Sequence, residues 1–429
     1  MRLKPEPRSE PLDSPLRVCL ITYRGNPTCG GQGVYVKRIA RILADRGHEV
    51  HVVSGPPYPE LDERIPLHRL PSLDLYNPEA LFRVPSLREL ATPVNLLEWL
   101  AVSSGGFPEP YTFGVRAYRF FRDRCPVRFD ILHDNQSLAY GLLKVRRLGL
   151  PLVATIHHPI TYDLKAELEQ QPVRWKRLKI RRWYSFVRMQ VRVARKLSHI
   201  ITVSESARRD TAASFRIPVE RFRVVQNGID TDLFRPHPEV KRDPQRIIVT
   251  NSADSPVKGV RYLLEAVASI ARTRDVRLTV IGTPKKHGVV ERLVRDLDLA
   301  RHVEFAGRVE DEDFPLHYAR ASLAVVASIY EGFGFPAGEA MACGTPVVAT
   351  TGGALPEVVG DAGVLVPPAD AGALERAILD LLDHPRKREA LSRAGYERIH
   401  KHFTWERAAD KIVAVYREVI RDHRGLRPH

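Results

Sequence analysis

Two carboxylates in one glycine-rich segment have the clearest chemical potential in this chain. Seven residues separate Glu331 from Glu339 in the segment Tyr330-Glu-Gly-Phe-Gly-Phe-Pro-Ala-Gly-Glu339, which follows an apolar run from Ala321 to Ala327. A carboxylate accepts hydrogen bonds from two vicinal hydroxyls, which a hexose or a ribose offers. Glu339 also has a purely structural interpretation, because negative charge is favourable near a helix N-terminus. For Glu331, which lies in the turn, the pattern favours a functional role.

The same segment also suits a phosphate group. Gly332 and Gly334 allow close approach of the backbone to a ligand, and Pro336 fits the first turn of a helix whose amino end carries partial positive charge. A second glycine-rich turn, Thr28-Cys-Gly-Gly-Gln-Gly-Val34, precedes the first helical pattern of the chain. That turn offers backbone N–H groups to an anion, but it is equally typical of a plain tight turn, because the full dinucleotide-binding fingerprint is absent.

Two successive alternations of strand and helix patterns position these segments. Apolar runs predict a first set of strands at 17–23, 49–54, 130–133, 152–156 and 200–203. A second set is predicted at 246–250, 276–281, 303–305, 322–327, 346–349 and 363–366. Such alternation is typical of parallel, doubly wound sheets, whose ligands bind beyond the carboxyl ends of the strands. We therefore expect an α/β fold with two facing Rossmann-like domains and an interdomain cleft.

The predicted domain boundaries follow from this pattern. Residues 1–16 are rich in proline and charge and are predicted to form a disordered leader. The first Rossmann-like domain is expected at 17–223, the second at 224–403, and a C-terminal helix and tail at 404–429. Ten prolines, besides Pro126 at its end, interrupt the stretch from 55 to 126, which we expect to form loops and short helices.

The composition restricts the possible function classes. Of 429 residues, 44% are hydrophobic and 27% are charged, and no apolar run is long enough to span a bilayer. The four cysteines form no C-x-x-C pair, so we expect no zinc site and a reduced, cytoplasmic location. A formal charge of +15 favours phosphates, nucleic acids or anionic lipid as partners. We expect no nucleic-acid partner, because no motif that reads nucleic acid is recognisable.

The basic excess is concentrated between Arg174 and Lys196, a stretch with ten Lys or Arg and no acidic residue. The spacing predicts an amphipathic helix over 181–194, with apolar residues on one face. A stripe of arginines is expected on another face, at Arg181, Arg188, Arg192 and Arg195. Two interpretations remain open: a helix docked on the core with a solvated face, or a contact with the anionic inner face of a membrane.

Beyond these patterns, the segment EGFGFPAGEAMACGTPVVAT resembles the E-x7-E signature of retaining nucleotide-sugar glycosyltransferases of family 4, which have the GT-B fold. Other blocks resemble the same family in the same order, among them GGQGVYVKRIARILADRGHEVHVVS, VATIHH, VVQNGIDTDLFRP and PVKGVRYLLEAV. The resemblance implies transfer of a hexosyl unit from a nucleotide diphosphate sugar to an acceptor hydroxyl, with retention of anomeric configuration. It also implies that no metal or other cofactor is needed, and that the acceptor is lipid-linked or a saccharide of the cell envelope.

The resemblance further implies roles for single residues. Glu331 would bind hydroxyls of the donor hexose, and Glu339 would hold the ribose of the nucleotide. Lys258 would neutralise the diphosphate leaving group, Gly31 would let its loop close over that phosphate, and His157 would face the reacting sugar from the acceptor-side, N-terminal domain. The implied donor-binding set is Gly30, Gly31, Lys258, Glu331, Gly332, Phe333, Gly334 and Glu339, with His157 and Glu331 as the catalytic residues.

One departure from the family pattern concerns the diphosphate. The family usually has an arginine a few residues before the Lys-Gly pair, where this chain has Ala253. A nearby base would then have to substitute for it; Lys285 and Lys286 are candidates, although the pattern favours solvated loop lysines at these positions. The alternative function that this leaves open is a sugar-nucleotide-binding protein with lost or weak transferase activity.

Overall fold

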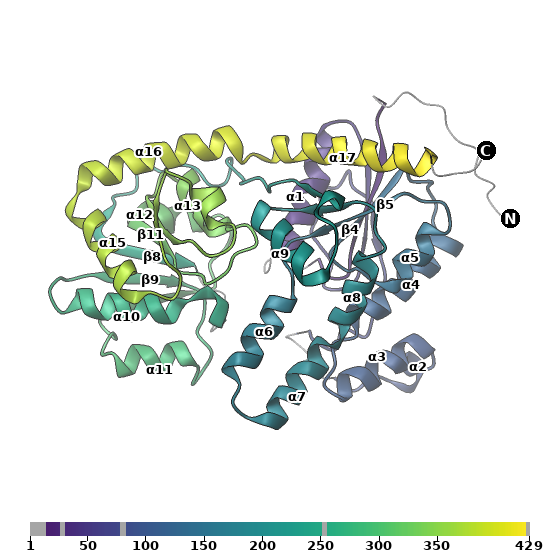
Figure 1. Ribbon diagram of the computed structural model, residues 1–429, viewed down its shortest axis with the longest axis horizontal. Helices are drawn as coiled ribbons and strands as arrows, with labels where there is room; N and C mark the ends of the chain where they lie inside the picture. The colour runs from purple at the N-terminus through teal and green to yellow at the C-terminus, as the bar shows by residue number, and fades with distance from the viewer. Residues whose placement is uncertain (1–13, 26–30, 78–82, 251–254, 426–429) are drawn as a thin grey trace. The chain divides into compact units, whose positions relative to one another are not determined.

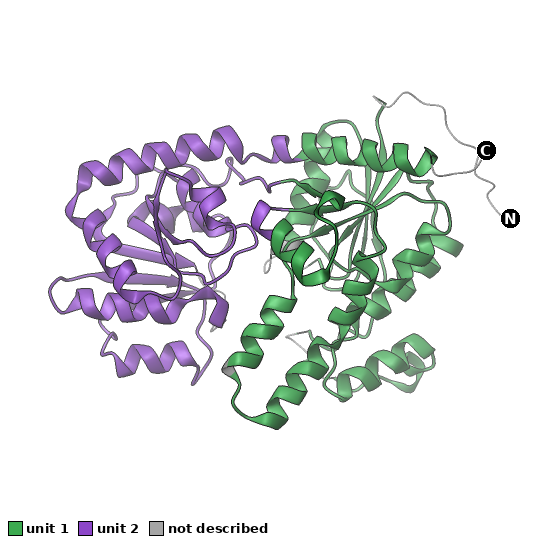
Figure 2. Ribbon diagram, viewed as in Figure 1, with its two compact units in different colours: residues 1–202, 208–225, 409–429 green, residues 203–207, 226–408 purple. Residues whose placement is uncertain are grey.

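The computed structural model describes residues 14–25, 31–77, 83–250 and 255–425. The chain divides into two compact units (Figure 2). Unit 1 comprises residues 1–202, 208–225 and 409–429, and unit 2 comprises residues 203–207 and 226–408. Two of the four boundaries fall inside helices, α9 (Glu205–Phe215) and α17 (Trp405–Gly425).

Unit 1 is built on a parallel sheet of seven strands in the order β3-β2-β1-β4-β5-β6-β7. The strands are β1 (Arg17–Thr22), β2 (Glu49–Ser54), β3 (Leu67–Arg69), β4 (Ile131–Asn135), β5 (Leu152–Ile156), β6 (Ile200–Thr202) and β7 (Phe222–Val224). The register of β1 on β2 runs from Arg17 opposite Glu49 to Thr22 opposite Ser54. The order reverses direction between β1 and β4, which is the switch point at which ligands of doubly wound sheets bind.

Helices connect the strands of unit 1 (Figure 1). They are α1 (Gly31–Asp45), α2 (Leu87–Leu90), α3 (Pro93–Ser103), α4 (Glu109–Asp123), α5 (Tyr140–Arg146), α6 (Thr161–Gln170), α7 (Arg174–Trp183) and α8 (Val187–Ala194), together with most of α9 and α17. The helices α6 and α7 extend away from the sheet of this unit (Figure 1). Leu16, the last residue of the predicted leader, is buried, and its backbone N–H donates to Nδ1 of His48 at 3.0 Å. Residues 1–13 lie outside the described part of the chain.

Unit 2 repeats the same topology with a six-stranded parallel sheet in the order β10-β9-β8-β11-β12-β13. The strands are β8 (Asp243–Thr250), β9 (Arg277–Ile281), β10 (Val303–Gly307), β11 (Ala321–Val326), β12 (Val347–Thr350) and β13 (Val364–Val366). The helices are α10 (Val260–Ala271), α11 (Val289–Asp296), α12 (Phe314–Arg320), α13 (Phe335–Ala342), α14 (Leu355–Val359), α15 (Ala371–Asp383) and α16 (Pro385–His402).

Both faces of the unit 2 sheet are covered, which explains its continuous apolar runs. Ile247 and Val249 of β8 pack into one hydrophobic cluster, with α10 and α15, while Ile248 between them packs into a second cluster, with α13 and α14. Successive side chains of a strand point to opposite faces of the sheet, so a strand that is buried on both faces has apolar residues at successive positions. The predicted α/β class with two Rossmann-like sheets is confirmed.

The stretch from 55 to 126 is more regular than expected. It contains the edge strand β3 and the 15-residue helix α4, where loops and short helices were predicted. Proline at 110 is compatible with α4, because it lies in the first turn, where its missing N–H breaks no helical hydrogen bond.

The basic helix predicted over 181–194 is wrong as a single element. Helix α7 ends at Trp183, a 3-10 turn spans Tyr184–Phe186, and α8 begins at Val187. The turn brings two aromatic side chains onto one buried ring. Trp183 stacks on Phe107 at 5.1 Å between ring centroids, and Phe186 meets the same ring edge-on at 5.3 Å. These contacts favour the interruption over a straight helix.

Candidate functional site

The strongest candidate site of unit 2 lies at the switch point of its sheet. Strand β8 lies between β9 and β11 in the sheet. The connection after β8 leads to β9 on one side, and the connection after β11 leads to β12 on the other side, so the two connections diverge where β8 and β11 end next to each other. Lys258 follows β8, and Glu331 follows β11. Because parallel strands end at the same edge, the two predicted residues meet there.

Lys258 and Glu331 form an ion pair. The Nζ of Lys258 donates to Oε1 of Glu331 at 2.6 Å, and the hydroxyl of Ser328 donates to the same oxygen at 2.7 Å. The side chain of Glu331 is 11% exposed and that of Lys258 is 28% exposed. The carboxylate is therefore held in place by two donors, while the ammonium retains access to solvent and to a ligand.

Backbone geometry fixes the loop that carries Lys258. Residues Pro256–Lys258 form a 3-10 turn, and the N–H of Ile329 donates to the carbonyl of Val257 at 2.7 Å. Gly259, the N-cap residue of α10, has φ +63°, and a Cβ there would lie 2.0 Å from the carbonyl oxygen of Ala327. Only glycine fits at this contact, because both the left-handed backbone and the close approach exclude a side chain.

Glu339 is the fifth residue of α13, which begins at Phe335, so it lies just past the first turn of the helix. The N-cap residue Gly334 has φ +105° and provides no side-chain cap. The hydroxyl of Tyr318 donates to Oε2 of Glu339 at 3.3 Å. Burial is the main cause that raises the pKa of Glu339 to about 7, with repulsion from Asp311 and Glu331 adding to it.

Gly332 and Phe333 join the turn to the body of unit 2. The hydroxyl of Ser204 donates to the carbonyl of Gly332 at 2.8 Å. The ring of Phe333 is buried and packs against Phe335 and Phe403. The side chain of Phe333 therefore stabilises the core, and a ligand would meet this residue through its backbone.

In unit 1, His157 follows β5 and is held by two polar side chains from the end of β4. Its Nε2 lies 2.7 Å from Oδ1 of Asn135, and its backbone N–H donates to Oε1 of Gln136 at 2.7 Å. Tyr35 packs edge-on against its ring at 4.8 Å. Burial lowers the pKa of His157 to about 3, so the imidazole is neutral at physiological pH.

Other histidines of unit 1 have structural partners. His133 is buried between the hydroxyls of Tyr416 and Thr155, each 2.6 Å away. His158 pairs with Asp163 at 2.8 Å.

Two of the predicted residues lie outside the described part of the chain. Gly30 and Ala253 belong to segments that the structure does not describe, and Gly31 is the first residue of α1. Lys285 and Lys286 are exposed and follow β9, the neighbour of β8.

The predicted arginine stripe is divided between two helices. Arg181 lies on α7, whereas Arg188 and Arg192 lie on α8 and Arg195 is its C-cap. The Nη1 of Arg192 donates to the hydroxyl of Tyr140 at 3.3 Å, and the Nε of Arg195 donates to the carbonyl of Phe215 at 2.7 Å. Two of the four arginines thus have structural contacts within unit 1.

One group of side chains in unit 1 has the spacing of a metal site. Donor atoms of His199, Glu418 and Asp422 all lie within 4.8 Å of one another. Arg223 already donates two hydrogen bonds to the carboxylate of Glu418, so a cation would have to displace a guanidinium. Across residues 14–25, 31–77, 83–250 and 255–425, no helix combines the length and the apolar character needed to cross a bilayer.

Sequence reasoning missed the side chains that orient the site. Ser328, Tyr318, Asn135 and Gln136 each hold a predicted functional group by a hydrogen bond. The sequence could have indicated Asn135 and Gln136, because polar residues directly after an apolar strand lie at the ligand-binding edge of a parallel sheet.

Comparisons with known proteins show the family of the chain. The family described as "Glycosyltransferase Family 4" matches residues 29–233, and "Glycosyl transferases group 1" matches residues 234–398. The chain is 45% identical over 410 residues to the MMP alpha-(1->4)-mannosyltransferase of Mycolicibacterium hassiacum, across 94% of this chain and 98% of that protein. It is 28% identical over 441 residues to the D-inositol 3-phosphate glycosyltransferase of Thermobispora bispora, across 97% of this chain and 95% of that protein.

Solved structures show the same fold. The sucrose-phosphate synthase of Thermosynechococcus elongatus superposes with a TM-score of 0.71 at 24% identity, over 95% of this chain and 100% of that chain.

Proposed function

Because this chain belongs to the family 4 (group 1) glycosyltransferases and has their GT-B fold of two Rossmann-like domains, we propose that it transfers a hexosyl unit from a nucleotide diphosphate sugar to an acceptor hydroxyl with retention of anomeric configuration. The observation that carries the proposal is the Lys258–Glu331 ion pair at the switch point of unit 2. The pair offers an anion-binding cation and a hydroxyl-binding carboxylate side by side.

The proposed roles follow from where charge develops. Breaking the bond between sugar and phosphate builds negative charge on the leaving diphosphate, so a fixed cation lowers the barrier selectively. Lys258 would supply that cation, and the backbone N–H groups at the start of α13 would add partial positive charge. Together they do what a divalent metal would otherwise do, which supports transfer without a metal ion.

The carboxylates would bind hydroxyls. Glu331, oriented by Ser328, would accept hydrogen bonds from the donor hexose, and Glu339 would accept them from the ribose. Gly30, Gly31, Gly332, Phe333 and Gly334 complete the donor site through their backbones in this proposal.

His157 is proposed to meet the reacting sugar from unit 1. Its neutral imidazole can donate or accept one hydrogen bond without adding charge, and Asn135 fixes the ring orientation. The transferred hexose is proposed to be mannose, because the relative with 45% identity is a mannosyltransferase. A saccharide acceptor follows from the same relationship.

We also propose that the protein contacts an anionic membrane on the cytoplasmic side. Helix α7 supports this contact better than the predicted arginine stripe does. Six of its ten residues are Lys or Arg, none is buried, and Trp175 and Leu178 are 55% and 63% exposed. Exposed apolar and basic side chains on one helix favour an interfacial contact.

The experiment that tests the function combines a donor panel with product analysis. Melting temperature is measured with nucleotide diphosphate sugars that differ in base and hexose, and the stabilising donor is then incubated with saccharide acceptors. NMR of the product should show the anomeric configuration of the donor. An inverted product would contradict retention, and donor binding without transfer to any acceptor would favour the sugar-nucleotide-binding alternative.

A further inference from the structure

A large cavity in unit 1 has no role in the function proposed so far. It has a volume of about 800 Å³, within the range of ligand-binding pockets. Its walls come from the edge strand β3 and the residues after it, from the α2–α3 segment, and from one side of α4. The residues implied in donor binding do not line it.

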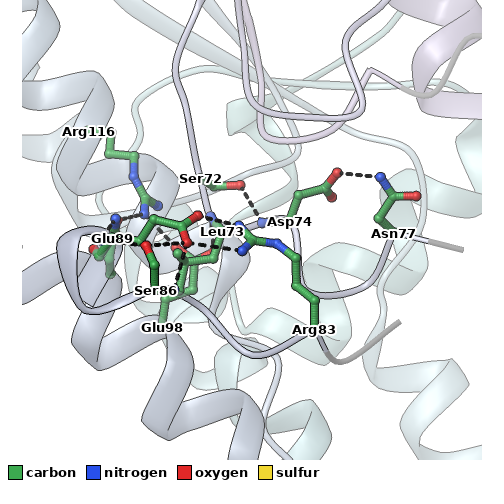
Figure 3. Close-up of polar contacts among 10 residues, drawn as sticks. Ser72, Leu73, Asp74, Asn77, Arg83, Ser86, Glu89, Glu98 and Arg116 are labelled. Atoms are coloured by element: carbon green, nitrogen blue, oxygen red, sulfur yellow. Dashed lines mark hydrogen bonds and ion pairs between the residues drawn. The ribbon is translucent and has the colours of Figure 1, made fainter. Parts of the chain in front are cut away.

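One wall of this cavity, the β3–α4 cavity, is held rigidly by a buried ion pair (Figure 3). The Nη2 of Arg116 donates to Oε2 of Glu98 at 2.6 Å and to Oδ1 of Asn95 at 2.7 Å. The other carboxylate oxygen of Glu98, whose residue is 1% exposed, accepts from the backbone N–H of Leu73 at 3.1 Å. These bonds tie α3, α4 and the segment after β3 together, so the wall is preformed.

The acidic residues that line the cavity already have cationic partners. Glu89 accepts from Arg83 at 2.6 Å and from the backbone N–H of Ser86 at 2.8 Å (Figure 3). Those hydrogen bonds lower the pKa of Glu89 to about 2. Asp123 accepts two hydrogen bonds from Arg122, at 2.6 and 2.7 Å. Arg124 and Arg119 also help to lower the pKa of Asp123, so this single carboxylate offsets part of their charge, and the wall keeps an excess of arginines.

The remaining charge of the wall is positive. Arg69, Arg119 and Arg124 line the cavity and are exposed, and among the described residues none of the three donates a hydrogen bond to a carboxylate or forms an ion pair with one. Arg69 is ordered by its position over the ring of Tyr58, 5.2 Å from the centroid. A guanidinium fork matches the geometry of a phosphate or carboxylate group.

The rest of the lining suits a sugar ring. Phe120 and Leu70 offer apolar surface, and Thr92, Asn95 and Ser72 carry groups that can hydrogen-bond to hydroxyls. We propose that the β3–α4 cavity binds a carbohydrate that carries an anionic group, a phosphate or a carboxylate, as a second saccharide site of this glycosyltransferase. The three arginines bind the anion, and Phe120 packs on the ring.

Calorimetric titration at low ionic strength tests this site with defined probes. The probes are mannose 6-phosphate, glucuronic acid and, as the neutral reference, mannose. Saturable binding of at least one anionic probe is expected, and the preferred probe distinguishes phosphate from carboxylate. In the double variant Arg119→Ala/Arg124→Ala the affinity should fall at least about tenfold, the usual effect of losing charge-assisted hydrogen bonds.

Two controls separate this site from other anion-binding groups. Arg147→Ala removes one exposed arginine of unit 1 that does not line the cavity, and its affinity should equal that of the wild type. Lys258→Ala disables the proposed donor site and should also leave probe binding unchanged. Arg119 and Arg124 are both exposed, so their replacement should leave the fold intact. The circular dichroism spectrum of the double variant should therefore match that of the wild type.

Three results would overturn the proposal: no saturable binding of either anionic probe to the wild type, equal affinity in the double variant, or a loss of binding in Lys258→Ala instead. Failure of the donor function itself would leave these titrations unaffected, so the two claims are independent.

Discussion

Replacing Lys258 should lower the stability of unit 2. Removing the charge of Glu331 in the same protein should restore much of the lost stability. At 2.6 Å the two charges attract by about 6 kcal/mol at an effective dielectric constant of about 20. Desolvation of a largely buried carboxylate and solvent access to Lys258 offset most of this energy, leaving a net coupling of about 1–2 kcal/mol.

The single variant Lys258→Ala leaves the Glu331 carboxylate, which is 11% exposed, with Ser328 as its remaining side-chain donor. We expect a cost of about 2 kcal/mol, because an uncompensated charge in a buried position is more expensive than the lost attraction alone. For a unit of this size that cost lowers the melting temperature by about 4–8 °C.

Calorimetric melting of the ligand-free protein measures the effect in a double-mutant cycle of wild type, Lys258→Ala, Glu331→Gln and the double variant. Glutamine keeps an oxygen that can accept from Ser328 but carries no charge. The double variant should therefore melt above Lys258→Ala. Costs that add to within about 0.5 kcal/mol would refute the ion pair as a stabilising contact.

Three further predictions concern Ser328, Glu339 and helix α7. Ser328→Ala should lower kcat by about ten- to a hundredfold, because the loss of one hydrogen bond to a charged group costs about 1.5–3 kcal/mol; an unchanged kcat would show that Lys258 alone orients the carboxylate. Because the pKa of Glu339 is raised to about 7 from 4.5, its ionisation costs folded-state stability, so the wild type should lose stability relative to Glu339→Gln as the pH rises from about 4.5 to 7; parallel melting curves would contradict the raised pKa. The variant Lys176→Glu/Lys179→Glu should weaken flotation with anionic liposomes and leave transfer to a water-soluble acceptor unchanged; equal flotation of both proteins would exclude α7 as the membrane contact.

The long strands could be predicted from sequence because burial on both faces leaves an unbroken apolar run. Strand β5 was predicted with its exact bounds, and β12 within one residue. The three-residue edge strands β3 and β7 escaped prediction, because the sequences Leu-His-Arg and Phe-Arg-Val contain no apolar run. The equally short strands β6 and β13 were predicted, because their residues are mostly apolar. The place of β3 and β7 in the sheet is set by pairing with β2 and β6 instead.

Tertiary contacts decided the features that local pattern could not. Helical spacing continues through Trp183 and Phe186, yet both rings pack on Phe107, which is far away in the sequence, and the helix breaks between them. Likewise, nothing local marks Tyr318 as the partner of Glu339, because the two residues belong to different helices, α12 and α13, that meet in space. Ser328 lies only three residues before Glu331, but the conformation of that loop decides whether its hydroxyl reaches the carboxylate.

The most direct test of the central claim is the single-turnover rate of hexosyl transfer by Lys258→Ala and Glu331→Ala, compared with the wild type and with Lys401→Ala, which removes an exposed lysine of the same unit. If Lys258 stabilises the leaving diphosphate and Glu331 holds the donor hexose, each site variant should be slower by about a hundredfold or more, while Lys401→Ala should keep the wild-type rate. Wild-type rates in both site variants would contradict the account.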